Sequence, residues 1–160
     1  MSELVYPISL GRDEIAGLIP HRGDIFVCQR LLIEDPHKYA GVASWPRENA
    51  LIQGHFPGFH MVPGVFLIEA MAQLAGAGLL AGDPYVRSLT GDLLGVLASV
   101  RKCHFKQPVL PDREVEFRID CRQMAPLAVQ VGAIVNVDSK EVAQLDVLVV
   151  YVPRSQLPGA

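Results

Sequence analysis

Residues 54–82 have the sequence GHFPGFHMVPGVFLIEAMAQLAGAGLLAG, and the rest of the chain is organised around them. After the Pro63-Gly64 turn, the segment from Val65 to Gly82 carries a single ionisable side chain, Glu69. Such a segment predicts a helix buried in a core or a membrane, because no polar face remains for solvent. A carboxylate in that position is costly unless it is paired, neutralised or used. We therefore interpret Glu69 and His55, in the preceding loop, as a candidate acid–base pair.

The composition predicts one well-packed domain. The chain has 160 residues, of which 50% are hydrophobic and 19% are charged, and its mean hydropathy is +0.27. A chain of this length can bury about two thirds of the surface that it exposes when unfolded. We expect a single domain over residues 1–160, with a core over 12–152 and a frayed tail over 153–160.

Charge and targeting signals exclude several classes of function. The net charge of −3 leaves no basic footprint, so we expect no nucleic-acid partner. The first fourteen residues lack a basic segment followed by an apolar one, so we expect no signal peptide and a cytoplasmic location. Residues 62–80 approach the length of a membrane span, but Pro63, Glu69 and Gln73 interrupt them and no basic anchors flank them. We therefore expect no membrane span.

The cysteines indicate a reducing compartment. Cys28, Cys103 and Cys121 are odd in number and lie in apolar or alternating segments. They form no CxxC pair, and no set of His, Cys and carboxylate residues has the spacing of a metal site. We interpret them as reduced thiols of a cytosolic core, and we expect no metal.

Outside the central segment, the pattern is mostly that of β-strands. A short helix at Arg12–Leu18 precedes Pro20, and Gly82–Gly91 is typical of a loop. Glu114–Arg122 alternates apolar and charged residues, which indicates an antiparallel strand with one wet face. The polar residues 138–141 predict a hairpin turn. The predicted strands are Ile25–Ile33, Tyr39–Trp45, Leu93–Phe105, Glu114–Arg122, Leu127–Val137 and Val142–Val152.

These elements predict an α+β fold in which five or six antiparallel strands curl around one long, wholly buried helix. A sheet offers only one face to such a helix, so only a strongly curved sheet can cover most of it. A second copy of the chain would complete the cover. The last strand is apolar on both faces at Val147–Val150, so we expect it at an inner or paired position of the sheet. The pattern leaves the strand order open.

Three motifs of this chain are similar to those of one enzyme family. Gly54–Gln73 has the pattern GHFPGxxxxPGVxxxEAMAQ, residues 20–22 are PHR followed by an apolar strand that ends at Arg30, and Lys106–Pro111 is KQPVLP. Together they resemble the β-hydroxyacyl-acyl-carrier-protein dehydratases of the FabZ type. That resemblance implies the hotdog fold, a curved antiparallel sheet wrapped around a central helix, and it covers about residues 12–152.

The resemblance also implies a reaction, the loss of water from a 3-hydroxyacyl thioester to give a trans-2-enoyl thioester. His55 would take the proton from C2, because a neutral imidazole is available near pH 7. Glu69 would protonate the departing hydroxyl, and apolar surroundings favour its protonated form. The free N–H groups of Gly64 and Val65 at the helix start would bind the thioester oxygen. Gln73, one turn after Glu69, would orient it through a hydrogen bond.

The same resemblance implies the partners. The substrate would be carried on the phosphopantetheine arm of acyl carrier protein, with no cofactor in the enzyme itself. His55 of one protomer would meet Glu69 of the other in a homodimer with shared active sites, and a trimer of dimers is a further option. Arg101, Lys102 and Lys106 are the best basic cluster for an acidic carrier protein, although a solvated strand edge explains them equally well.

Other interpretations stay open at this level. A hotdog acyl-thioesterase, an enoyl-CoA hydratase and a non-catalytic acyl-binding subunit are the alternatives. The pair of His55 and Glu69 favours the dehydratase, because a thioesterase needs no histidine in this motif. His21 is interpreted as structural and His60 as a loop residue. Departures from the family pattern within residues 24–30 allow a specialised lipid or polyketide-like pathway as well as fatty-acid biosynthesis.

Overall fold

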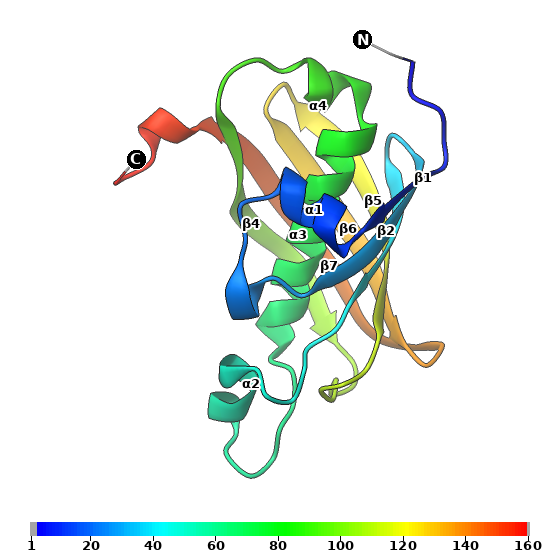
Figure 1. Ribbon diagram of the computed structural model, residues 1–160, viewed down its shortest axis with the longest axis vertical. Coiled ribbons are helices and arrows are strands. Elements are labelled where there is room, and N and C mark those ends of the chain that lie inside the picture. Colours follow the sequence, from blue (N-terminus) through cyan, green and yellow to red (C-terminus); the bar gives the residue numbers. More distant parts are fainter. Residues whose placement is uncertain (1–2, 160) are drawn as a thin grey trace.

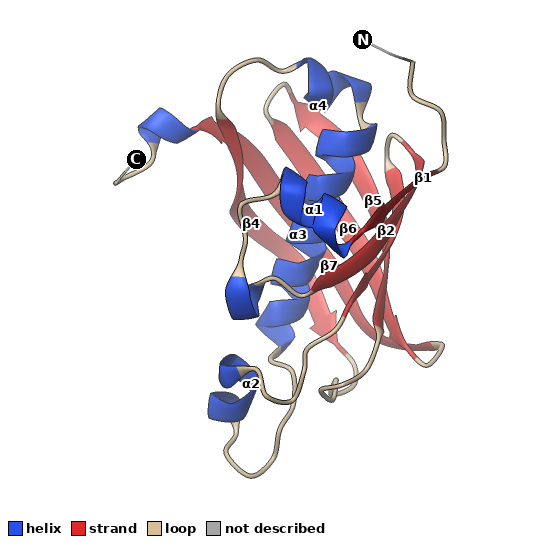
Figure 2. Cartoon of the chain, in the orientation of Figure 1, coloured by secondary structure: helices blue, strands red, loops and turns tan. Residues whose placement is uncertain are grey.

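The fold is a seven-stranded antiparallel sheet that curves around one long helix, α3 (Gly64–Gly82). The computed structural model describes residues 3–159. Its strands follow the order β1-β2-β3-β5-β6-β7-β4, and each neighbouring pair is antiparallel. Figures 1 and 2 show α3 crossing the concave face of the sheet, with the short helix α1 lying over it. This arrangement confirms the predicted α+β class, a curved sheet around a central helix.

Six of the strands match predicted segments to within a few residues at each end. The strands are β1 (Ile8–Gly11), β2 (Cys28–Asp35), β3 (Lys38–Ala43), β4 (Leu93–Phe105), β5 (Val115–Ala125), β6 (Ala128–Val137) and β7 (Lys140–Pro153). The helices besides α3 are α1 (Arg12–Leu18), α2 (Ala50–His55) and α4 (Pro84–Ser88), with 3₁₀ turns at Gly23–Ile25 and Arg154–Gln156.

The sequence pattern does not predict three short elements, β1, α2 and α4. Helix α4 lies in a segment expected to be a loop, and α2 lies in the expected loop around His55. Each helix begins at a capping side chain, since Asn49 accepts from the N–H of Leu51 and Asp83 accepts from the N–H groups of Tyr85 and Val86. Strand β1 exists through its pairing with β2. Elements this short show too little periodicity to be detected.

The C-terminal half of the sheet follows the pattern closely. In β5 the apolar positions are buried and the charged positions are exposed, as the alternation predicts. Strand β7 lies between β6 and β4, which confirms its inner position. The turn between β6 and β7 consists of Asp138 and Ser139, both with positive φ, as a type I′ hairpin requires. After β7, Arg154 forms an ion pair with Asp92 at 3.1 Å.

The seating of α3 depends on glycines in its second half. A Cβ atom at Gly78 would lie 2.6 Å from the ring of Tyr39, and one at Gly82 would lie 2.5 Å from Ile33. Both distances are well below van der Waals contact, so a larger residue would have to displace the side chain of Tyr39 or Ile33. These glycines therefore let the helix approach β2 and β3 closely.

One stripe of the helix is uncovered within a single chain, which corrects the expectation of a wholly buried helix. Val65 is 63% exposed and Leu80 is 38% exposed, and the half-buried Glu69 belongs to the same stripe of the helix. The sheet ends at β4, so its curvature does not reach this stripe within one chain. Among residues 3–159, α3 is the one helix long and apolar enough to cross a membrane. Its other faces are buried against the sheet, as in a soluble core.

Two alanine substitutions in α3 test this seating. We expect Gly78→Ala to destabilise the protein by about 1–3 kcal/mol, because the added methyl group would overlap the buried Tyr39 ring. Gly76→Ala is the matched control, since its Cβ would meet only Ile19, at 4.0 Å. We expect it to be neutral or stabilising by up to about 1 kcal/mol. Urea unfolding of both variants measures the difference, and equal stability would contradict the close contact.

Candidate active site

Glu69 lies in the second turn of α3, and a buried amide holds its carboxyl. Gln73 Nε2 donates to Glu69 Oε1 at 2.9 Å and to the carbonyl oxygen of Ile25 at 2.9 Å. Gln73 is 2% exposed, and its own Oε1 accepts a hydrogen bond from the thiol of Cys28 at 3.6 Å. The amide is thus held at both ends, and it restrains the Glu69 carboxyl in turn.

A second side chain reaches the same carboxyl oxygen. His21, in the connection between α1 and β2, places its Nε2 3.3 Å from Glu69 Oε1. The residue interpreted as structural from the sequence therefore contacts the candidate acid. No spacing rule joins these two residues in the sequence. The PHR tripeptide was the one signal that could have pointed to His21.

His55 and Glu69 are not joined within one chain. His55 is the last residue of α2 and is exposed, and its ring contacts that of Phe56 with centroids 4.2 Å apart. Across residues 3–159, no hydrogen bond or ion pair links His55 to Glu69. A site that uses both side chains therefore needs a second chain or a movement of the segment between α2 and α3.

The N-terminus of α3 has free N–H groups. Its N-cap is Pro63, which makes no side-chain hydrogen bond to the first turn. The N–H groups of Gly64 and Val65 have no intrahelical acceptor, as at any helix start. Gly64 also packs closely on β4, because a Cβ atom there would lie 3.0 Å from the ring of Phe105. Packing therefore explains this glycine independently of any substrate.

A cavity of about 160 Å³ lies beside Glu69. Its walls come from α3, from β4, from β6 and β7, and from the connection after α1. Most of the wall is aliphatic or glycine, which suits an acyl chain. The polar side chains on the wall are His21, Glu69, Gln73, Tyr151 and Arg154.

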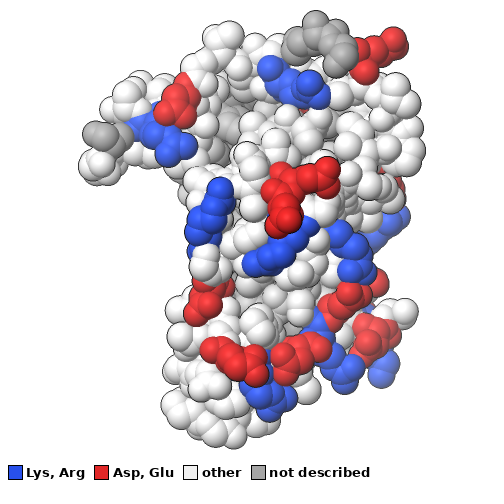
Figure 3. All heavy atoms as spheres, viewed as in Figure 1, with Lys and Arg blue, Asp and Glu red and all other residues white. Residues whose placement is uncertain are grey.

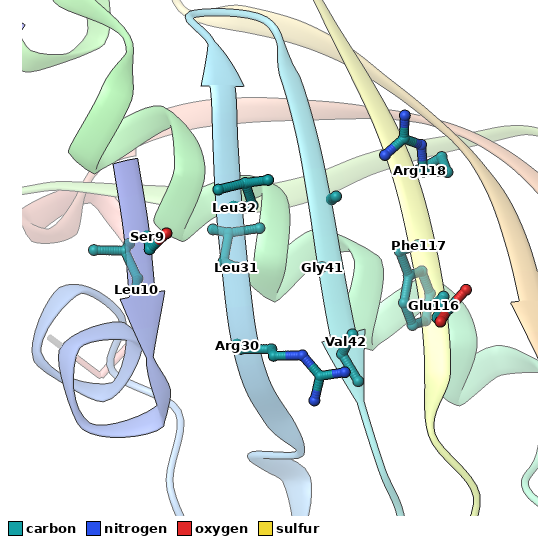
Figure 4. A pocket seen from close by; sticks show the side chains of 11 residues that line it. Ser9, Leu10, Arg30, Leu31, Leu32, Gly41, Val42, Glu116, Phe117 and Arg118 are labelled. Atoms are coloured by element: carbon teal, nitrogen blue, oxygen red, sulfur yellow. The ribbon is translucent and has the colours of Figure 1, made fainter. Parts of the chain in front are cut away.

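A second hollow, of about 370 Å³, crosses strands β1, β2, β3 and β5 (Figure 4). Its charged residues, Arg30, Glu116 and Arg118, alternate along their strands with Leu31 and Phe117, which are buried. Because neighbouring strand residues point to opposite faces, these charged side chains lie on the outer face of the sheet. The hollow is therefore separated from Glu69 by the sheet itself and is not part of the candidate site.

Surface charge is mixed in sign. The face in Figure 3 shows acidic and basic groups side by side, with no large patch of one sign. Of the basic cluster expected to meet a carrier protein, Lys106 is paired with Glu141, while Arg101 and Lys102 are exposed on β4. Within the described part of the chain, no group of three or more His, Cys, Asp or Glu side chains could hold a metal ion.

Comparison with known proteins identifies the family. Residues 34–133 match the family model described as ApeI-like, ApeI dehydratase. The chain belongs to this dehydratase family. It is similar to the 3-hydroxyacyl-[acyl-carrier-protein] dehydratase FabZ of Syntrophotalea carbinolica, with 30% identity over 146 residues, 89% of this chain and 95% of the relative. The FabZ of Solibacter usitatus is 26% identical over 148 residues, 92% of this chain and 89% of the relative.

Solved structures support the hotdog fold. The dehydratase heterocomplex ApeI:P from Xenorhabdus doucetiae matches with a TM-score of 0.72 at 12% identity, over 91% of this chain and 93% of that chain. A hypothetical thioesterase with coenzyme A from Streptococcus pneumoniae matches with a TM-score of 0.51 at 9% identity, over 74% and 81%. The chain is thus a FabZ-type dehydratase with a hotdog fold, as the sequence motifs predict.

Thiol reactivity tests the environment of the candidate site. Burial raises the pKa of the Cys28 thiol to about 12, and burial likewise raises the pKa of Cys121 to about 12. Because the thiolate is the reactive form, we expect both to react with an aromatic disulfide reagent at pH 8 at least ~100-fold more slowly in the native protein than in urea. Any fast native reaction should belong to Cys103, which is only half-buried.

The control for this measurement is Cys103→Ser, which should remove the fast phase and leave two thiols that react only after unfolding. A fast native reaction in Cys103→Ser would mean that the region around Cys28 or Cys121 is open to solvent, contrary to the structure.

Proposed function

We propose that this dehydratase removes water from 3-hydroxyacyl thioesters on acyl carrier protein and forms trans-2-enoyl thioesters, in fatty-acid or related lipid biosynthesis. The observation that carries the proposal is the Glu69 carboxyl, which Gln73 holds on the wall of an aliphatic cavity. An acyl chain in that cavity would have its first carbons beside the carboxyl. The FabZ relatives are named for this reaction, which supports the assignment.

Dehydration moves two protons, and the proposal assigns one to each side chain. A ring nitrogen of His55 takes the proton from C2, and the C–H electron pair forms the new C2–C3 double bond. The C3–O bond breaks, and the departing hydroxyl takes a proton from Glu69 and leaves as water. The step is redox-neutral, so the proposal includes no cofactor beyond the phosphopantetheine arm of the carrier protein.

The growing negative charge on the thioester oxygen also needs hydrogen-bond donors. The uncapped first turn of α3 offers the N–H groups of Gly64 and Val65, and the helix dipole adds positive potential there. These groups lie on the same helix as Glu69, one turn before it. We therefore assign the oxyanion contact to this turn.

We propose in addition that two copies of the chain share their active sites. Strand β4 is an edge of the sheet, and it is 13 residues long. Its apolar side chains Leu97, Val100 and Phe105 are each about half exposed, and a long apolar edge favours pairing with another strand. The uncovered stripe of α3 flanks β4 across the cavity. A second copy placed along β4 would cover both surfaces.

A shared site is supported by the position of His55. It is exposed at the end of α2 and is not joined to Glu69 of its own chain. The exposed rings of Phe56 and Phe59 next to it give this segment an apolar surface for a partner. The similar ApeI:P structure is titled a heterocomplex, so a related but different chain is the other possible occupant. The presence of both His55 and Glu69 in one chain favours a second copy, and a trimer of dimers is a further stage of the same proposal.

The proposal also covers the contacts with acyl carrier protein and the cellular location of the enzyme. Arg101 and Lys102 lie exposed on β4, near the edge where the second copy would begin, and they are the candidate contacts for an acidic carrier. A cytoplasmic location fits a soluble enzyme of thioester metabolism.

A hotdog thioesterase is the second candidate function, because one of the similar folds is titled a hypothetical thioesterase. In that reaction Glu69 would activate a water molecule, and the products would be a free acid and a free thiol. The HFPG histidine would then have no function.

The deciding experiment follows two products from 3-hydroxyacyl thioesters of several chain lengths, on carrier protein and on coenzyme A. We expect enoyl formation without thiol release. We expect His55→Ala and Glu69→Gln each to lower kcat by ~10²–10⁴-fold, because each removes a proton-transfer group. Enoyl absorbance and a thiol reagent give the two readouts.

Two exposed positions away from the site serve as controls. His37→Ala and Glu116→Gln, on the β2–β3 turn and on the outer face of β5, should keep wild-type activity. Thiol release without enoyl product would exclude the dehydratase and favour the thioesterase. Full activity in both site variants would leave the fold intact and reject the assigned residues.

Mixing the two inactive variants tests whether sites are shared. If His55 and Glu69 of one site come from different chains, each mixed dimer keeps one intact site. Random exchange makes half of the dimers mixed, so activity should recover to about a quarter of the wild-type value. Differently tagged copies confirm that exchange has occurred. Exchange without recovered activity would mean that each site is built within one chain.

A further inference from the structure

Two side-chain nitrogens lie close to one oxygen of Glu69. Gln73 Nε2 lies 2.9 Å from Oε1, and His21 Nε2 lies 3.3 Å from the same atom. No protein donor within residues 3–159 is bonded to the other carboxyl oxygen, Oε2. A protonated carboxyl accepts through one oxygen and carries its hydrogen on the other. The geometry therefore makes Oε2 the oxygen that carries the acidic proton.

The surroundings of the His21 ring favour one tautomer. Its Nδ1 is buried, and no partner for it lies among residues 3–159. Nδ1 is left unsatisfied in either neutral tautomer, because a bare nitrogen there would be a buried acceptor without a donor. Nε2 decides between the tautomers. With its hydrogen it presents a donor to Glu69 Oε1, whereas a bare Nε2 would place its lone pair 3.3 Å from an oxygen that already accepts from Gln73. In this form the ring presents a donor to Glu69 without adding a positive charge that would favour the carboxylate.

The segment that carries His21 is fixed against α3. Arg22 Nη1 donates to the carbonyl oxygen of Ile19 at 2.8 Å and to that of His21 at 2.6 Å, so its side chain closes the turn. Ile19 is 6% exposed and belongs to the core cluster that includes much of α3. The PHR tripeptide thus has a physical role in setting the position of the imidazole.

We propose that His21 is a positioning residue of the dehydratase, which with Gln73 holds Glu69 Oε1 so that Oε2 delivers the proton to the departing hydroxyl. This inference rests on the proposed role of Glu69 as the acid. It assigns to the neutral His21 ring the donation of one hydrogen bond and no proton transfer of its own.

A pair of substitutions separates this role from a merely structural one. His21→Leu removes the donor, and we expect kcat to fall about 10-fold or more with KM changed less than about 3-fold. His21→Gln can place an amide N–H near the position of Nε2, so it should recover kcat to within a few-fold of wild type. His37→Gln is the matched control on an exposed histidine and should have wild-type kinetics. Equal losses in the Leu and Gln variants, or no loss in His21→Leu, would overturn the proposal.

Two further measurements keep the outcome unambiguous. ¹⁵N-histidine spectra of the wild-type protein should show His21 as the neutral Nε2–H tautomer at the assay pH, and an Nδ1–H tautomer or an imidazolium would contradict the proposal. In the Glu69→Gln background, His21→Leu should lower kcat no further, because the group that it positions is gone. Wild-type activity of Glu69→Gln alone would reject the proposed function, whereas an inactive Glu69→Gln with a fully active His21→Leu would reject only the role of His21.

Discussion

The close contact between the glycine-rich half of α3 and the strands beneath it is the constraint on which the rest of the structure depends. Gly78 and Gly82 leave room for Tyr39 and Ile33, so the helix lies deep in the sheet at its C-terminal end. A helix is stiff over 19 residues, so this seating also directs its first turns. One stripe along the helix, which includes Glu69, faces the cavity beside β4, so the carboxyl is half-buried on a cavity wall instead of fully enclosed.

Buried side chains of the core also fix the position of this carboxyl. Burial raises the pKa of the Cys28 thiol to about 12, so the thiol stays protonated and can donate to the Gln73 oxygen. The Gln73 amide must then turn its N–H groups toward Glu69 and the Ile25 carbonyl. A chain of hydrogen bonds thus connects β2 to the carboxyl through side chains that solvent does not reach. Such satisfied buried polar networks restrict the number of conformations.

Within one chain, the parts of the machinery that the proposed reaction needs lie apart. The carboxyl, its donors and the aliphatic cavity lie together, whereas His55 lies at the exposed end of α2. The surfaces left open are the apolar edge strand β4, the outer stripe of α3 and the rings next to His55. All of these surfaces would be costly to leave in water. Because these open surfaces lie beside Glu69 and His55, we propose that the association of two chains also completes the active site.

The sequence by itself determined the α+β class, six of the seven strands, the extent of α3 and the family, because these follow from periodicity and from one long motif. It also predicted that Glu69 and Gln73 share a helix face, since they are four residues apart. Only the tertiary structure decided the strand order, the half-exposure of α3 and the contact of His21 with Glu69. Those features depend on which segments distant in the chain pack together, and no local pattern of residues encodes that choice.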